Sequence, residues 1–130
     1  FSPGKEYDVN PYGNSIIVNG DWLKANKATV KAFVSVTQKA FAACAKDAAP
    51  CIAALVEANK GLKVANETTN WGLVKELMTD KTSTTVGLGY MDETRMQKSY
   101  AVFEPYLAAK FDISKHFTNE FIDTSVKLMK

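Results

Sequence analysis

The sequence predicts a mostly α-helical chain, with about five helices and one strand. Three observations support this prediction. Apolar residues recur at the three- and four-residue spacing of amphipathic helices over most of the 130 residues. Only the run Ile16–Val18, in the stretch "NSIIVNG" bounded by Asn and Gly, has the β-branched character of a buried strand. With 46% hydrophobic and 23% charged residues, the chain can bury the core of one domain.

The charge and hydropathy of the chain argue against two classes of function. The formal net charge is only +2 at pH 7 and no Lys/Arg cluster is present, so we expect no nucleic-acid partner. No apolar run approaches the ~20 residues that a membrane span needs. There is no signal-peptide pattern, but the chain starts at Phe1 and not at a methionine. We therefore expect a processed or trimmed start that a leader once preceded.

The first part of the chain predicts a linker, a strand and a long helix. Residues 1–13, "FSPGKEYDVNPYG", hold two prolines and two glycines and predict a hinge or linker segment. Residues 14–19 predict the buried strand. Asp21 is a good N-cap for a short helical turn, "WLKAN". A helix over 28–46 follows, with one apolar stripe.

Two further helices are expected before residue 80. The first begins near Asp47, and its first turn holds Pro50, where proline is tolerated. Gly61 is the expected C-cap of this helix. The next helix covers about 66–79. The stretch "TDKTSTTVGLG" that follows is rich in threonine and predicts a polar loop.

The stretch "GLGYMDETRMQ", residues 87–97, raises the question of a phosphate-binding loop. Asp92 stands where a dinucleotide fingerprint has its third glycine, and no Gly-Lys-Ser/Thr is present. We therefore interpret it as a helix start, in which Gly87 and Gly89 turn the backbone and Asp92 is the N-cap. Arg95 shares the first turn with acidic residues, and such a charged cluster is usually a solvated face.

The last third of the chain predicts two helices and no catalytic residue. Pro105 should kink or shorten the helix that starts at Asp92. A final helix is expected after Thr118, its N-cap. His116 could act as a base, but no nucleophile stands at a telling spacing.

Cys44 and Cys51 are the two cysteines of the chain. With one histidine, they supply too few ligands for a structural zinc, so we expect no metal and no cofactor. Their spacing also differs from that of a redox motif. Two interpretations stay open, a disulfide across a tight helical corner and two small core residues. The disulfide would imply an oxidising compartment.

The best candidates for ligand binding lie just before the strand. Aromatic and short polar residues alternate there with proline and glycine, a composition that suits a ligand-lining loop at a sheet edge. An ordinary turn-rich linker is the alternative. The candidate residues are Tyr7, Asp8, Asn10, Tyr12 and Asn14.

The single strand poses a physical problem. A buried strand cannot satisfy its own backbone N–H and C=O groups, and this chain offers no second strand of similar quality. The partner strands must therefore lie in a missing part of the protein or in a second copy. We interpret the chain as the tail of a larger α/β protein.

The order of segments resembles a known family. "YGNSIIVNGDWLKANKATVKAFVSVTQKAF" is followed by "AAPCIAALVEAN", "GLGYMDETRMQKS" and "FTNEFID". From about Tyr12 onward, this succession resembles the C-terminal part of periplasmic substrate-binding proteins of ABC importers. The group it most resembles handles nitrate, sulfonates, taurine and pyrimidine precursors of thiamine. The order and spacing of these segments together carry the resemblance.

The resemblance implies a two-lobed α/β periplasmic-binding-protein (type II) fold, of which this chain would be a C-terminal fragment. Residues 1–13 would be a hinge segment and residues 14–130 the C-terminal part of the first lobe. Such a protein captures a small solute between its lobes and delivers it to a membrane permease without covalent chemistry. A periplasmic location would favour a Cys44–Cys51 disulfide. Within the hinge stretch, Tyr12 and Asn14 would be the leading ligand contacts.

Two alternatives remain at this stage. One is a small helical interaction module that forms a homodimer by strand exchange between copies. The other is a pyrimidine-synthesis enzyme that shares the binding-protein fold. Such an enzyme would need His or Cys chemistry in its cleft, whereas His116 lies far from the hinge stretch and the cysteines look structural. We therefore expect a protein that is not an enzyme.

Overall fold

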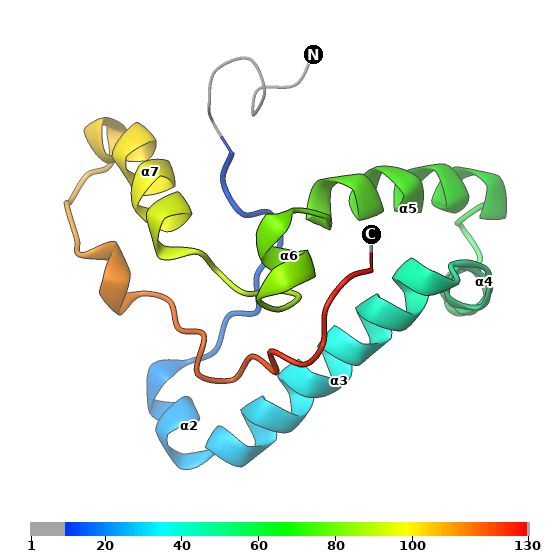
Figure 1. The fold of residues 1–130 in the computed structure, drawn as a ribbon, viewed down its shortest axis with the longest axis horizontal. Coiled ribbons are helices and arrows are strands. Elements are labelled where there is room, and N and C mark those ends of the chain that lie inside the picture. Colours follow the sequence, from blue (N-terminus) through cyan, green and yellow to red (C-terminus); the bar gives the residue numbers. More distant parts are fainter. Residues whose placement is uncertain (1–9, 130) are drawn as a thin grey trace. The chain divides into compact units, whose positions relative to one another are not determined.

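A computed structural model of the chain describes residues 10–129. Figure 1 shows a helical architecture, and no β-strand occurs within these residues. The helices are α2 (Gly20–Ala25), α3 (Lys27–Lys46), α4 (Ala49–Ala58), α5 (Val64–Met78), α6 (Lys81–Thr85) and α7 (Glu93–Phe103), and two 3-10 turns follow, η1 (Glu104–Tyr106) and η2 (Ile113–Lys115). The prediction of a mostly α-helical chain is therefore confirmed.

The described residues form two compact units. One contains residues 10–27 and 91–121, and here it is called the α7 unit. The other contains residues 28–90 and 122–129 and is called the α3 unit. The division of the chain at residue 13 into a hinge segment and a lobe stays a prediction.

The α7 unit begins with the short helix α2. Its N-cap is Asn19, whose side chain accepts hydrogen bonds from the backbone N–H groups of Asp21 and Trp22, both at 3.0 Å. The prediction that Asp21 is the cap was wrong by two residues. Asp21 lies instead in the first turn, where its negative charge suits the helix dipole, and pairs with Lys24 at 2.9 Å.

Helix α7 starts as the sequence predicts. The Asp92 side chain accepts the backbone N–H of Arg95 at 2.8 Å, which satisfies one of the free amides of the first turn. The regular helix ends at Phe103, and Pro105 lies in the 3-10 turn η1 that follows. The expected shortening by Pro105 is therefore confirmed.

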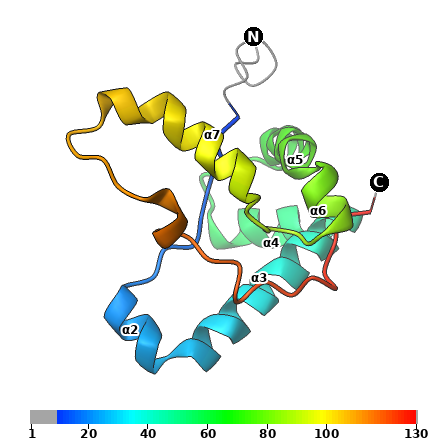
Figure 2. The same ribbon diagram turned by 60° about the vertical axis from the view of Figure 1, so that its left-hand side comes forward.

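The α3 unit has a small apolar core. Val30 and Val34 of α3 are buried, as is Ile52 of α4. Leu88 and Leu128 complete the core from residues outside the helices. Both ribbon views show the C-terminal segment running beside α3 (Figures 1 and 2).

Buried polar groups fix that C-terminal segment. The Gln38 side chain, 5% exposed, donates to the carbonyls of Leu88 at 2.7 Å and Asp123 at 3.2 Å. Its oxygen accepts the N–H of Asp123 at 2.9 Å. The Leu128 N–H also donates to the carbonyl of Ser83 at 3.0 Å. One glutamine therefore satisfies three backbone groups inside the unit.

The stretch between α5 and α7 is more ordered than expected. The predicted Thr-rich loop contains the helix α6. A capping box between Asp80 and Ser83 stabilises the N-terminus of this helix. Asp80 and Ser83 are the signal for this helix that the prediction missed. Gly89 then adopts a φ of +81°, which favours glycine, and a Cβ on Gly87 would lie 3.3 Å from the Cα of Thr124. Gly89 therefore turns the backbone as predicted, whereas Gly87 allows the close approach of the segment around Thr124.

The predicted buried strand over 14–19 was wrong. The segment is irregular, and Ile17 is 92% exposed. The physical reason is the one noted from the sequence: within residues 10–129 no other strand exists with which its backbone could pair.

The predicted last helix and the predicted end of one other helix were also wrong. Residues 116–129 form no helix, and Thr118 caps only a local turn by accepting the N–H of Glu120 at 3.1 Å. The backbone of this segment bonds to Gln38 and Ser83 instead, so tertiary contacts prevail over helix periodicity. Helix α4 ends at the C-cap Asn59 and not at Gly61, and the Asn59 side chain accepts the Gly61 N–H.

Candidate functional site

Two of the predicted ligand-loop residues lie against the first turns of α7. The Arg95 guanidinium donates from Nε to the Asn10 carbonyl at 2.8 Å. Its Nη2 donates to Asn10 Oδ1 at 3.0 Å and to the Pro11 carbonyl at 3.2 Å. The planar, multiple-donor geometry of arginine allows one side chain to hold two consecutive residues of the loop.

Tyr12 completes this arrangement. The Arg95 guanidinium carbon lies 4.0 Å from the centre of the Tyr12 ring, within the range of a cation–π interaction. The Tyr12 hydroxyl oxygen accepts the backbone N–H of Asp92 at 2.7 Å. That N–H belongs to the N-cap residue of α7, so the tyrosine is tied to the start of the helix. We call Asn10, Pro11, Tyr12, Asp92 and Arg95 the Arg95 clamp.

An open groove of about 230 Å³ lies beside the clamp, within the α7 unit. Its lining offers carboxylate, hydroxyl, amide and cationic groups and one apolar side chain: Asn10, Asp92, Thr94, Arg95, Lys98, Ser99 and Val102. Such a surface can form hydrogen bonds with a small polar molecule. At this volume it is smaller than the roughly 300–1,000 Å³ of pockets that enclose a ligand.

The five candidate ligand residues have different outcomes. Tyr7 and Asp8 lie outside the described residues. Asn10 and Tyr12 meet in the clamp, and Asn10 also lines the groove. Asn14 is exposed and makes no hydrogen bond within residues 10–129, so the structure does not bring it to the clamp.

The sequence did not indicate Arg95 as the partner of this loop. It was interpreted as part of a solvated charged face, whereas its guanidinium binds Asn10 and Pro11. Those residues lie 85 and 84 positions away along the chain. Helical spacing carries no information about such a contact. Only the combination of a tyrosine with an arginine gave a weak signal.

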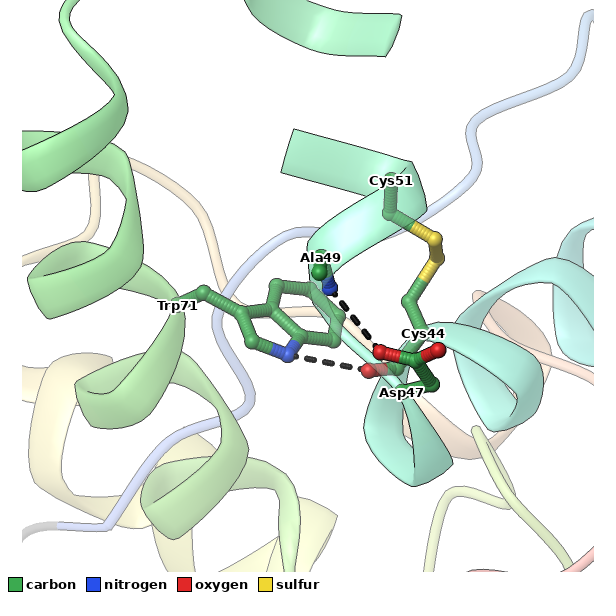
Figure 3. The surroundings of a disulfide bond; sticks show 5 residues. All are labelled: Cys44, Asp47, Ala49, Cys51 and Trp71. Atoms are coloured by element: carbon green, nitrogen blue, oxygen red, sulfur yellow. Dashed lines mark hydrogen bonds between the residues drawn. A yellow bond between two sulfur atoms is a disulfide. The ribbon is translucent and has the colours of Figure 1, made fainter. Parts of the chain in front are cut away.

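A second ordered feature lies in the α3 unit. Cys44 and Cys51 form a disulfide across the corner between α3 and α4, with their Cα atoms 5.8 Å apart (Figure 3). Of the two interpretations left open by the sequence, the disulfide is confirmed. The bond is compatible with an oxidising compartment outside the cytoplasm.

His116 has a structural environment. Its Nδ1 donates to the Asp112 carbonyl at 2.9 Å, and its ring lies 4.7 Å from that of Phe111. Within the described part of the chain, no group of three or more His, Cys, Asp or Glu side chains could hold a metal ion. In the same residues, no helix has the length and apolar character of a membrane span.

The comparison with known families points to one class of protein. Residues 1–49 match the family model described as NMT1/THI5 like. This match supports the resemblance to substrate-binding proteins of ABC importers over the first part of the chain. The searches of curated proteins and of solved structures gave no significant match.

Proposed function

We propose that this chain is part of the solute-binding component of an ABC importer. In this proposal it captures a small organic solute or anion, such as a sulfonate, nitrate or a pyrimidine, and delivers it to a permease in the membrane. The match of residues 1–49 to the NMT1/THI5-like model carries the proposal. The matched residues include the loop in which the ligand contacts were predicted.

The groove beside the Arg95 clamp supports a binding role that needs more than this chain. Its lining is polar enough to orient a small solute, but it is open and small for a complete pocket. A second lobe that closes over the loop would supply the missing walls. We therefore propose that the chain is the C-terminal part of a two-lobed protein, in which Asn10 and Tyr12 face the solute.

The exposed apolar segment over 14–19 supports the same proposal. Ile16 and Ile17 are 47% and 92% exposed, although β-branched residues of this kind are usually buried in a sheet. Partner strands from the rest of a larger protein would cover them. No covalent step is part of the proposed function, so the protein would not be an enzyme.

The disulfide supports a periplasmic location, since such bonds persist in oxidising compartments. The test has two parts. The product of the complete gene should appear in the periplasmic fraction with both cysteines inaccessible to a thiol-alkylating reagent. The purified product should then be stabilised against heat by one member of a panel that contains taurine, nitrate and an aminopyrimidine.

A matched variant sharpens the binding test. Tyr12→Ala should abolish the thermal shift caused by the ligand, and Tyr106→Ala should not, because Tyr106 is 86% exposed and distant in sequence from the loop. A product that stays in the cytoplasm with free thiols, or that responds to no panel member, would contradict the proposal.

One observation favours a second candidate function. The same exposed Ile16–Val18 segment could pair with its copy in a second chain, which would make the protein a strand-pairing homodimer. Sedimentation of the 130-residue chain over a range of concentrations distinguishes the two. A dimer that Ile17→Lys dissociates would support strand pairing, and a monomer at all concentrations would exclude it.

A further inference from the structure

Helix α5 packs against α4 through side chains that stay partly exposed. None of its residues is buried, whereas α3 and α4 bury side chains in the core. Leu77 on α5 is 81% exposed, and Gly72 in the middle of the helix lowers its intrinsic stability. Trp71 carries the hydrogen bond and the ring contact that join α5 to α3.

Trp71 satisfies a backbone group that α3 leaves unpaired. The last carbonyls of a helix have no partner within it, and Cys44 lies in the last turn of α3, which ends at Lys46. Trp71 Nε1 donates to the Cys44 carbonyl at 3.2 Å (Figure 3). The indole also lies 5.9 Å from the ring of Phe41 on α3. Trp71 is thus the anchor of α5 on the end of α3.

The same tryptophan lines an apolar groove toward α4. Cys51, Ile52 and Leu55 of α4 form one side of this groove of about 190 Å³, and Trp71 and Val74 of α5 form the other. Trp71 therefore contacts the Cys44 end of α3 and also faces the start of α4. It can do both only while these two helix ends keep their relative position.

The disulfide sets that relative position. In the corner between the helices, the Asp47 side chain accepts the N–H of Ala49, the first residue of α4, at 3.2 Å, and this hydrogen bond is exposed to water. The Cys44–Cys51 bond adds a covalent link between side chains to the two-residue backbone connection, and it joins the residue that offers the carbonyl to a residue that lines the groove. Figure 3 shows the disulfide next to the hydrogen bond from Trp71 to the Cys44 carbonyl, which anchors α5.

We propose that the Cys44–Cys51 bond is a redox-sensitive clamp for α5. With the bond formed, Trp71 stays docked; with the bond reduced, the corner opens and α5 is released. Both cysteines are only half-buried, so a small dithiol can reach them. This inference does not depend on the proposed function, because no solute takes part.

The reduction is a thiol–disulfide exchange. One thiolate of the dithiol attacks a sulfur of the bond and forms a mixed disulfide, and its second thiol then displaces the protein sulfur. Two electrons and two protons pass from the dithiol to the protein. The dithiol becomes a disulfide, and Cys44 and Cys51 become thiols.

The size of the effect follows from loop closure. The bond closes a short loop, since the cysteines are 7 positions apart. The chain-entropy relation gives roughly a 50-fold shift toward the unfolded chain when the bond is lost, which is the upper limit for a local opening. We therefore expect amide hydrogen exchange over 64–78 to become up to about 50-fold faster after reduction.

Hydrogen exchange of the full chain, with and without a dithiol, tests the proposal. Trp22→Phe leaves Trp71 as the single tryptophan, and its emission should shift to longer wavelength on reduction. Trp22 is 48% exposed and lies in α2, so this change should leave the α3 unit intact. Trp71→Phe keeps the disulfide but removes the donor, and should loosen α5 without any reductant.

The control is Cys44→Ser with Cys51→Ser. This double variant should exchange like the reduced protein and should not respond to the dithiol. If it fails to fold, the wild type reduced and alkylated under native conditions replaces it. Unchanged exchange over 64–78 after reduction would overturn the proposal. Equal acceleration in α3 and α5 would overturn it too, because the bond would then stabilise the whole unit and not α5.

Discussion

The two units of the chain each hold a segment that is distant in sequence, but they use opposite environments. In the α3 unit, Gln38 binds the backbone of Asp123, 85 residues away, inside a buried site. In the α7 unit, Arg95 binds the backbone and side chain of Asn10, also 85 residues away, in contact with water. The separation is the same, so the difference lies in burial and charge.

Burial changes the consequence of losing the contact. If Gln38 loses its amide, the backbone groups of Leu88 and Asp123 stay in a site from which water is largely excluded, and each unsatisfied group costs about 1–3 kcal/mol. If Arg95 is lost, water can replace its donors, so the cost is small. The exposed clamp should therefore contribute less to stability than the buried glutamine.

The largest effect on stability is expected from a substitution that breaks the buried contact of Gln38. Gln38→Leu keeps a side chain of similar volume but leaves three backbone hydrogen bonds unmade. We therefore expect a loss of about 2–4 kcal/mol in the free energy of unfolding. Chemical denaturation followed by circular dichroism measures it. Ala40→Leu is the control, since it introduces the same side chain at an exposed position of α3. Equal effects of both variants would show that Gln38 has no special role.

A smaller effect tests the turn that Gln38 holds. Gly89 has a φ of +81°, so Gly89→Ala should destabilise the protein by about 1–2 kcal/mol through backbone strain. Gly13→Ala in the α7 unit is the control, because a Cβ there meets no atom within 4 Å. Thermal unfolding of both variants gives the comparison. A Gly89→Ala protein as stable as the Gly13→Ala protein would mean that the turn relaxes freely.

These contacts also explain which parts of the fold the sequence could predict. Local signals were sufficient for α3, for the N-cap at Asp92 and for the end of α7 before Pro105, because each depends on residues within a few positions. They failed for 116–129, where an apolar pattern at helical spacing is held in irregular form by Gln38 and Ser83. Apolar residues at helical spacing carry no information about a hydrogen-bond partner 85 residues away along the chain.

The candidate site was predictable in the same limited sense. Composition marked the loop around Asn10 and Tyr12, but it could not identify Arg95 as the side chain that holds it. The cysteine pair was easier, because seven positions across a helical corner bring two sulfurs together by local geometry. The buried strand failed for a global reason, since a strand depends on partners that no local pattern supplies.

A still smaller effect is expected from the exposed clamp. Tyr12→Phe keeps a ring for the Arg95 guanidinium but removes the hydroxyl that accepts the Asp92 N–H, so we expect a loss of about 0.5–1 kcal/mol. Tyr106→Phe, at an 86% exposed position, should be neutral. Hydrogen exchange at Asp92 localises the change to the start of α7. A loss as large as that of Gln38→Leu would contradict the contrast between the two units.

The smallest effect compares one local motif in both units. Asp112 and Asp123 each accept hydrogen bonds from the N–H and hydroxyl of a serine two positions later, Ser114 and Ser125. The hydrogen bond from the serine hydroxyl is the main reason why the pKa of each carboxyl lies below its ordinary value of 3.8. Nearby lysines act in the same direction, chiefly Lys115 for Asp112 and Lys39 for Asp123.

A folded-state pKa below the unfolded value means that the carboxylate stabilises the folded protein above pH 3.8. This contribution is lost as the pH falls through the lowered pKa. Asp112→Asn and Asp123→Asn should therefore differ from the wild type above pH 3.8, and the differences should shrink as the pH falls below that value. Thermal unfolding across this range measures both. Only Asp123 has its backbone bound to Gln38, so only its variant should also speed hydrogen exchange at Leu88 and Leu128. If Asp112→Asn also speeds hydrogen exchange at distant residues of the α7 unit, the effect does not need the buried Gln38 side chain.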